Sequence, residues 1–314
     1  MCLHGDVKNI SEDAKEWCRK YAPKGLKGLE DENFLLSLMY PAYVRHLEVE
    51  RLRVIDENRE LNKINNSLDY MVEVLSGAFG CKLAFKGGYM LTKLLGSRAR
   101  QTSDVDFSIG SDELYGSIKE KLVEVCEHFI SMGIIDEYVI KESIQPRMSG
   151  GVVMKLDGHT VLGVDVGWHD ITYGTRIINL DVGEVNAFMV ERMLSDKLLA
   201  ILSRKRFRRS KDLYDLFVIS ECMDFNAKLV HDFMVKRSEG GIVEDWKNYP
   251  FSEKVLVEYK KAYSKLNLES IYKGVTLVKP DFDDVIYRLK VISEKVKEPN
   301  DCVMWCSRSH WFKE

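Results

Sequence analysis

The feature that most constrains the fold is a series of short segments in the middle of the chain, in which apolar and polar residues alternate. A period of two places the apolar side chains on one face of a β-strand, and Gly and Asp residues separate the segments as turns do. A stretch with helical spacing, residues 117–132, follows the first alternating segment. We therefore predict a mixed α/β sheet built from residues 83–85, 105–109, 138–140, 151–156, 160–166 and 177–180.

Helical periodicity dominates both ends of the chain. Apolar residues recur three or four positions apart over 12–21 and 32–75, with Pro41 as an interruption, and again over 190–204, 211–222 and 281–297. The predicted fold class is therefore α+β, a mixed sheet flanked by helices. We place the boundaries at a helical N-terminal region 1–62, a sheet domain 63–188 and a C-terminal helical domain 189–314.

Composition narrows the class of protein. A formal net charge of −3 argues against a polycation that coats nucleic acid or an acidic membrane over its whole surface. The seven cysteines follow no pairwise rhythm, which favours reduced thiols. No signal peptide and no apolar run of membrane-spanning length are present in the sequence, so we expect a cytoplasmic protein with no membrane partner.

Two acidic residues on one predicted strand indicate a metal site. Asp104 and Asp106 share a strand face, while Val105 and Phe107 point to the other side. Neighbouring carboxylates repel unless a cation lies between them, and oxygen ligands suit Mg²⁺ or Mn²⁺. Upstream, Gly87-Gly88 bring backbone amides and a helix N-terminus close to a phosphate. The combination predicts an NTP and metal site; a solvated strand edge is the alternative for Asp-x-Asp alone.

A third carboxylate is expected in a site that transfers phosphoryl or nucleotidyl groups with metal ions. Asp165 is the candidate, because Val164 and Val166 occupy the opposite face of its strand. Gly163 and Gly167 flank it and leave room for a ligand. The alternative is an aspartate that turns outward at the strand end.

Two blocks of this sequence resemble the AbiEii/AbiGii nucleotidyltransferase toxins, within the DNA-polymerase-β-like minimal nucleotidyltransferase superfamily. The first block is Phe85-Lys86-Gly87-Gly88 with Ser103-Asp104-Val105-Asp106-Phe107, and the second is residues 190–200 with Arg209-Ser210-Lys211-Asp212-Leu213-Tyr214-Asp215-Leu216. The resemblance covers roughly residues 70–220. It implies a nucleotidyltransferase-type sheet and an enzyme that transfers a nucleoside monophosphate from an NTP and releases pyrophosphate. It also implies a tRNA 3′ end as acceptor, a cognate antitoxin protein and a role in phage defence.

Roles for individual residues follow from the resemblance. Asp104, Asp106 and Asp165 would be catalytic metal ligands, and Lys197, Asp212 and Asp215 would complete the catalytic set. Lys86, Gly87, Gly88, Ser103 and Lys197 are the predicted nucleotide-binding residues. The alternatives are a lysine whose stem lies along apolar surface for Lys197, and a cap or surface ion pair for Asp212 and Asp215.

A basic segment connects the two predicted catalytic helices. Residues 192–211 hold eight Lys and Arg against one Asp, a charge of +7 within a nearly neutral chain. We predict RNA contacts from Arg204, Arg206, Arg208 and Arg209; a solvated helix end is the alternative. Three other functions remain open: transfer to a protein or small molecule, a non-catalytic nucleotide-binding module, and an RNA-binding module that uses the basic segment alone.

Overall fold

The computed structural model describes residues 12–22, 35, 39, 63–111, 113–141, 150–201, 209–238, 251–270, 277–297, 299 and 303–313. The chain divides into two compact units, Met1–Asn62 and Lys63–Glu314. In the first, helix α1 (Glu12–Tyr21) buries Ala14 and Cys18, which lie one turn apart, and Cys18 packs in a small cluster with Leu35 and Met39. The three-domain division stays a prediction.

The second unit contains a seven-stranded mixed sheet, as the alternating pattern predicted. Its strand order is β3-β4-β5-β2-β1-β7-β6. β2 pairs antiparallel with β1 and parallel with β5, which makes these three the centre of the sheet. The strands are β1 (Leu83–Lys86), β2 (Asp104–Ile109), β3 (Glu137–Lys141), β4 (Gly150–Leu156), β5 (His159–Trp168), β6 (Thr175–Leu180) and β7 (Gly183–Phe188).

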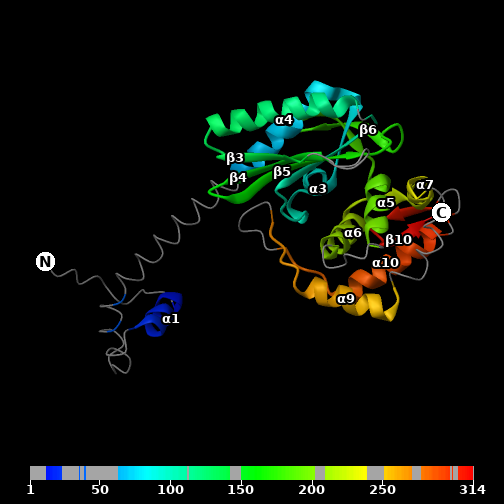
Figure 1. Ribbon diagram of the computed structural model, residues 1–314. Coiled ribbons are helices and arrows are strands. Elements are labelled where there is room, and N and C mark those ends of the chain that lie inside the picture. The colour runs from blue at the N-terminus through cyan, green and yellow to red at the C-terminus, as the bar shows by residue number, and fades with distance from the viewer. Residues whose placement is uncertain are drawn as a thin grey trace. The chain divides into compact units, whose positions relative to one another are not determined.

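Helices cover the sheet and form the C-terminal part. Figure 1 shows α4 (Glu113–Ser131) lying across one face of the sheet, with the C-terminal helices gathered below it. A helix over 63–79 leads into a short 3-10 turn, η2 (Gly80–Lys82), and β1. The remaining helices are α3 (Gly87–Leu95), η3 (Gly96–Arg98), α5 (Val190–Ala200), α6 (Ser210–Cys222), α7 (Ala227–Arg237), α9 (Glu253–Ser264) and α10 (Phe282–Lys297).

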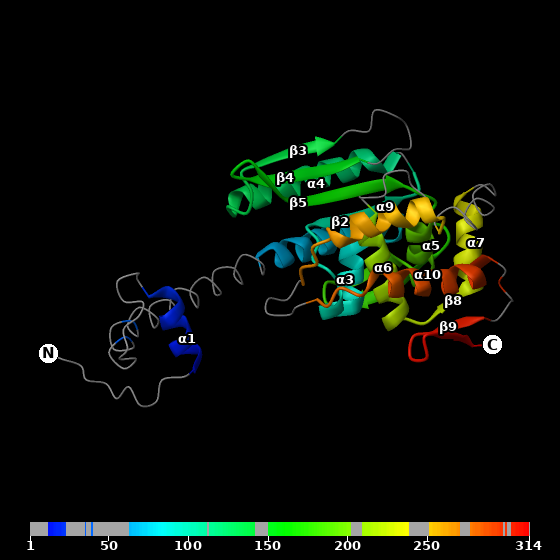
Figure 2. The same ribbon diagram turned by 90° about the horizontal axis from the view of Figure 1, so that it is seen from below.

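A second, three-stranded sheet closes the C-terminal part. It contains β8 (Phe225–Asn226), β9 (Met304–Cys306) and β10 (Trp311–Lys313), in the order β10-β9-β8. Figure 2 shows β8 and β9 side by side near the C-terminus. Trp305 is fully buried, stacks on Phe225, and donates its indole N–H to the carbonyl of Ser220 at 2.7 Å. The hairpin formed by β9 and β10 therefore packs against β8 and α6.

One continuous apolar core joins the seven-stranded sheet and the helices, from Leu68 to Phe312. The cysteines within the described ranges are free thiols. No helix in those ranges is both long and apolar enough to span a bilayer.

Candidate active site

The Gly87-Gly88 turn connects β1 to α3 and requires glycine at its first position. Gly87 has φ +80°, and a Cβ built on it would lie 1.9 Å from Asp106 Oδ2. A side chain there would be strained by the backbone and would also collide with the carboxylate. The first turn of α3 therefore lies directly against Asp106, where its free amides and dipole favour an anion.

The register of the central strands places the three predicted carboxylates together on one face of the sheet. Asp106 pairs with Asp165 across β2 and β5, and Asp104 pairs with Gly163. Val105 and Val164 are buried on the other face, as the alternation predicted. A Cβ at Gly163 would come within 2.5 Å of Asp104 Oδ1, so this glycine makes room for a carboxylate of the chain itself.

Charge repulsion is built into this carboxylate set. The pKa of Asp106 is raised, first because burial disfavours its charged form, and then because Asp165 and Asp104 are near; Lys86 and Lys197 oppose that rise. Asp165 forms an ion pair with Lys141 at 3.0 Å, with both side chains about half exposed. Within the described ranges, no group of three or more His, Cys, Asp or Glu side chains is arranged to hold a metal ion. The three-ligand metal site therefore stays a prediction.

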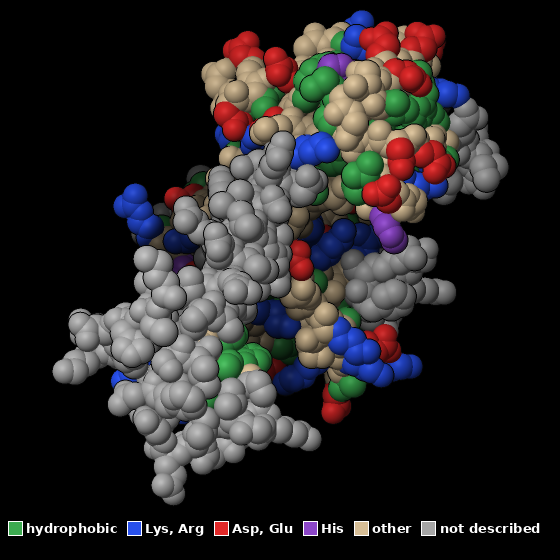
Figure 3. Space-filling model, turned by 90° about the vertical axis from the view of Figure 1, so that its left-hand side faces the viewer, with side chains coloured by type: hydrophobic (Ala, Val, Ile, Leu, Met, Phe, Trp, Pro, Cys, Tyr) green, Lys and Arg blue, Asp and Glu red, His purple; other side chains and the backbone are tan. Residues whose placement is uncertain are grey.

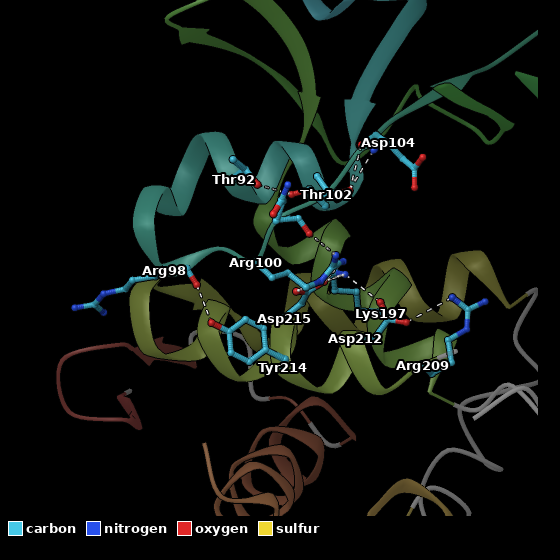
Figure 4. A network of polar contacts seen from close by, with 12 residues as sticks. Thr92, Arg98, Arg100, Thr102, Asp104, Lys197, Arg209, Asp212, Tyr214 and Asp215 are labelled. Atoms are coloured by element: carbon cyan, nitrogen blue, oxygen red, sulfur yellow. Dashed lines mark hydrogen bonds and ion pairs between the residues drawn. The ribbon is translucent and has the colours of Figure 1, made fainter. Parts of the chain in front are cut away.

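Opposite the strands, Lys197 lies in a buried network of charged groups (Figure 4). Its ammonium donates to Asp215 Oδ2 at 2.6 Å and to Asp212 Oδ1 at 3.1 Å. Burial lowers the pKa of Lys197, but Asp215 and Asp212 outweigh that effect and raise it above its usual value. Lys197 is therefore a cation held in place by two carboxylates. The alternative, a lysine whose stem lies along apolar surface, does not fit these contacts.

Arg100 completes this network and was not predicted from the sequence. Its Nε and Nη2 donate to the two oxygens of Asp215 at 3.0 and 3.1 Å, a bidentate pair. Burial raises the pKa of Asp215, but Lys197 and Arg100 outweigh it, so the pKa is lowered overall. No pattern in the sequence marks Arg100, which is one of two arginines, with Arg98, between α3 and β2. Asp215 is therefore a buried residue that orients Lys197, and it is not a surface ion-pair residue.

A cleft of about 260 Å³ opens between the strands and these helices. Two residues that were not predicted, Arg100 and Thr102, line this cleft. The predicted site residues Ser103 and Asp215 do not line it. Two larger cavities, each of about 440 Å³, lie elsewhere and contain none of the predicted site residues. The cleft is lined by these predicted site residues: Lys86, Gly87, Gly88, Asp104, Asp106, Asp165, Lys197, Arg209 and Asp212.

The basic segment is described only in part. Arg204, Arg206 and Arg208 lie outside the described residues. Arg209, at the start of α6, donates to Asp212 Oδ2 at 3.5 Å and lines the cleft. On the face shown in Figure 3, Lys and Arg side chains gather in a hollow in the middle of the surface, with acidic side chains beside them.

A glycine turn at a helix N-terminus, strand carboxylates and an opposing buried lysine are together the groups expected of a site for nucleotidyl transfer. The sequence matches the family model described as nucleotidyl transferase AbiEii toxin, type IV toxin–antitoxin system, over residues 70–285. This chain belongs to that family and is a nucleotidyltransferase toxin. The match extends to residue 285, well beyond the residues 70–220 that carried the resemblance.

Solved structures with similar folds are more distant. MenT4, a nucleotidyltransferase toxin from Mycobacterium tuberculosis, is 19% identical, with 77% of this chain and 85% of that chain covered and a TM-score of 0.48. JHP933 from Helicobacter pylori is 14% identical, with coverages of 78% and 92% and a TM-score of 0.43. A search of curated proteins gave no match. The family assignment therefore rests on the family model.

Proposed function

We propose that this toxin transfers a nucleoside monophosphate from an NTP to the 3′ end of an RNA, in particular a tRNA, with the help of a divalent metal ion. The observation that supports the proposal is the facing arrangement in the cleft. Asp104, Asp106 and Asp165 lie on the strand side, Lys197 lies on the helix side, and the first turn of α3 lies between them. Family membership implies an NTP substrate and an antitoxin partner.

The donor set fits Mg²⁺ or Mn²⁺. Carboxylate oxygens are the ligands these ions prefer. Burial, followed by the charges of Asp165 and Asp104, raises the pKa of Asp106, and a bound cation would oppose that rise. Asp104 and Asp106 would hold the ion, and Asp165 would join them once its oxygen leaves Lys141. When bound, the ion supplies neutralisation of charge between carboxylates and phosphates.

The chain's own groups bind and orient the triphosphate. The amides of the α3 N-terminus receive phosphate oxygens, and Lys197 neutralises charge that builds up during transfer. The RNA 3′ oxygen attacks the α-phosphorus, forming a P–O bond as the bond to the β-phosphate oxygen breaks. Pyrophosphate leaves with that electron pair, and the hydroxyl proton passes to solvent. Lys197 keeps its place because Asp212 and Asp215 hold it.

RNA is the preferred acceptor because of charge. Arg209 and Lys211, at the end of the basic segment 192–211, line the cleft, so a polyanion would meet cations there. Modification of tRNA ends would stop translation, which is the way such a toxin would act in phage defence in the cytoplasm.

The test incubates the purified chain with Mg²⁺, each labelled NTP in turn, and cellular RNA. We expect label on RNA, removed by nuclease, and lost in the double variant Asp104→Asn/Asp106→Asn. Asp283→Asn, an exposed aspartate on α10 with 76% of its side chain accessible, is the matched control. Label on a protein or a small molecule would show that this molecule, and not RNA, is the acceptor. Toxicity that survives in the double variant would contradict a catalytic role and favour nucleotide binding alone.

A further inference from the structure

A cluster of cations surrounds Asp196, which lines the cleft together with Lys86. Arg192 Nε and Arg237 Nε each lie 3.7 Å from Asp196 Oδ1, although neither arginine lines the cleft itself. Lys86 feels the charges of both Asp196 and Asp106. Three cations thus face two carboxylates, and the cluster carries an excess of one positive charge.

Arg192 adds a cation that the fold does not neutralise by hydrogen bonding. Its side chain is fully buried, and its Nε, Nη1 and Nη2 find no hydrogen-bond partner among the described residues. Aromatic rings surround the guanidinium instead, with Tyr173 at 4.3 Å and Phe188 at 4.9 Å from their centroids. Burial of a charge without hydrogen bonds is costly, so a neighbouring anion would stabilise the Arg192 guanidinium.

His169 holds Arg237 at the edge of this cluster. Its Nε2 accepts from Arg237 Nη2 at 2.7 Å and lies 3.5 Å from Lys86 Nζ, while Nδ1 donates to the carbonyl of Trp168. Burial, followed by Lys86, Arg237 and Arg192, lowers the pKa of His169 to about 3. The neutral ring therefore orients Arg237 and adds no charge. Gly167 leaves space for this ring, since a Cβ there would lie 3.1 Å from His169 Cε1.

We propose that Lys86 and Arg237 form an anion subsite that binds the β- and γ-phosphates of the NTP, the part released as pyrophosphate. This inference rests on the proposed function. Arg237 is one-third exposed, and its 3.7 Å contact with Asp196 is long for an ion pair, so a phosphate competes for it readily. A polyphosphate also matches the excess positive charge of the cluster. A backbone phosphate of RNA has the same chemistry, and the experiment separates the two sources.

The first measurement is calorimetric titration of the full chain with inorganic pyrophosphate. We expect Arg237→Ala to weaken binding at least tenfold, on the order of 1.4 kcal/mol, and Arg237→Lys to weaken it less. Lys228→Ala removes the same charge from the same helix α7, where Lys228 pairs only locally with Asp232 at 2.6 Å, and should change binding less than twofold. Thermal unfolding verifies that each variant is folded. Binding within twofold of wild type in Arg237→Ala overturns the proposal.

Transfer kinetics separate the two phosphate sources and the two hypotheses. Arg237→Ala should raise KM for the NTP and leave KM for RNA unchanged; the reverse result assigns the subsite to RNA and overturns the proposal. If the wild-type chain transfers nucleotide but does not bind pyrophosphate, the proposed function stands and the subsite proposal is overturned. Arg237-dependent pyrophosphate binding without any transfer supports the subsite and refutes the proposed function.

Discussion

Asp215→Asn is the substitution that most directly tests the buried network behind Lys197. The carboxylate of Asp215 is 4% exposed and accepts from Arg100 Nε, Arg100 Nη2 and Lys197 Nζ at 3.0, 3.1 and 2.6 Å. An asparagine has the same shape but offers one acceptor oxygen and one N–H₂ donor. In either orientation the amide therefore points a donor at a buried cation.

The size of the effect follows from these contacts. Removal of one partner from a buried ion pair costs about 3–5 kcal/mol, because it leaves an uncompensated charge. Lys197 keeps Asp212 at 3.1 Å, so we expect a loss near the lower end of that range. For a unit of this size, about 3 kcal/mol corresponds to a fall of about 6–12 °C in Tm.

Thermal unfolding as a function of pH tests the cause as well as the size. The pKa of Asp215 is lowered in the folded chain, so its contribution is full above the unfolded pKa of about 3.9 and is lost as pH falls through the folded pKa. The difference in Tm between wild type and Asp215→Asn should therefore persist from pH 7 to pH 5 and shrink in strong acid. Asp283→Asn should stay within about 1 °C of wild type. A fall in Tm of less than about 2 °C for Asp215→Asn would refute this account. So would a difference in Tm between the two proteins that does not shrink in strong acid.

Four further predictions follow from individual contacts. Gly87→Ala should abolish transfer and lower Tm by several degrees, whereas Gly116→Ala, in a helix with nothing within 4 Å of its Cβ position, should not lower it. In NMR titrations, the ring signals of His169 should stay constant between pH 5 and 8, because its pKa is about 3; a midpoint near 6.5 would contradict its burial. Lys141→Met should tighten Mn²⁺ binding measured by calorimetry, because it frees Asp165; unchanged affinity would exclude Lys141 as a competitor. Asp106→Asn should raise Tm at pH 7 without divalent ions, because it removes a charge whose pKa is raised; a lower Tm would contradict the repulsion.

The sequence predicted the local parts of the site well. Alternation along β2 placed Asp104 and Asp106 on one strand face, and alternation along β5 placed Asp165 opposite Val164 and Val166. The pairing register in the structure then brings the three to one face of the sheet. The structure added the reason for Gly87, because a Cβ at this position would lie 1.9 Å from Asp106 Oδ2. The family assignment of the chain was also confirmed.

Contacts between distant segments were not predictable from periodicity. Strand β7 was missed because its buried Asn186 interrupts the apolar pattern; its amide donates to the carbonyls of Cys81 and Leu83, each at 3.2 Å. The C-terminal hairpin was missed because Trp305 finds its partners in β8 and α6, about eighty residues earlier. Arg100 meets Asp215 across the fold for the same reason. Such pairs depend on tertiary structure, which a local pattern does not contain.

Two aspartates in this molecule have opposite electrostatic surroundings, and the difference separates folding from function. Asp215 faces two cations and its pKa is lowered, so its charge stabilises the folded chain. The pKa of Asp106 is raised, first by removal from water and then by Asp165 and Asp104, although Lys86 and Lys197 oppose the rise, so its charge destabilises the folded chain. Folding alone would not favour a carboxylate at Asp106, which faces a cleft that also holds Lys197. A cationic ligand in the cleft would lower this remaining cost, which is the physical basis for proposing metal binding on the strands and lysine positioning on the helices.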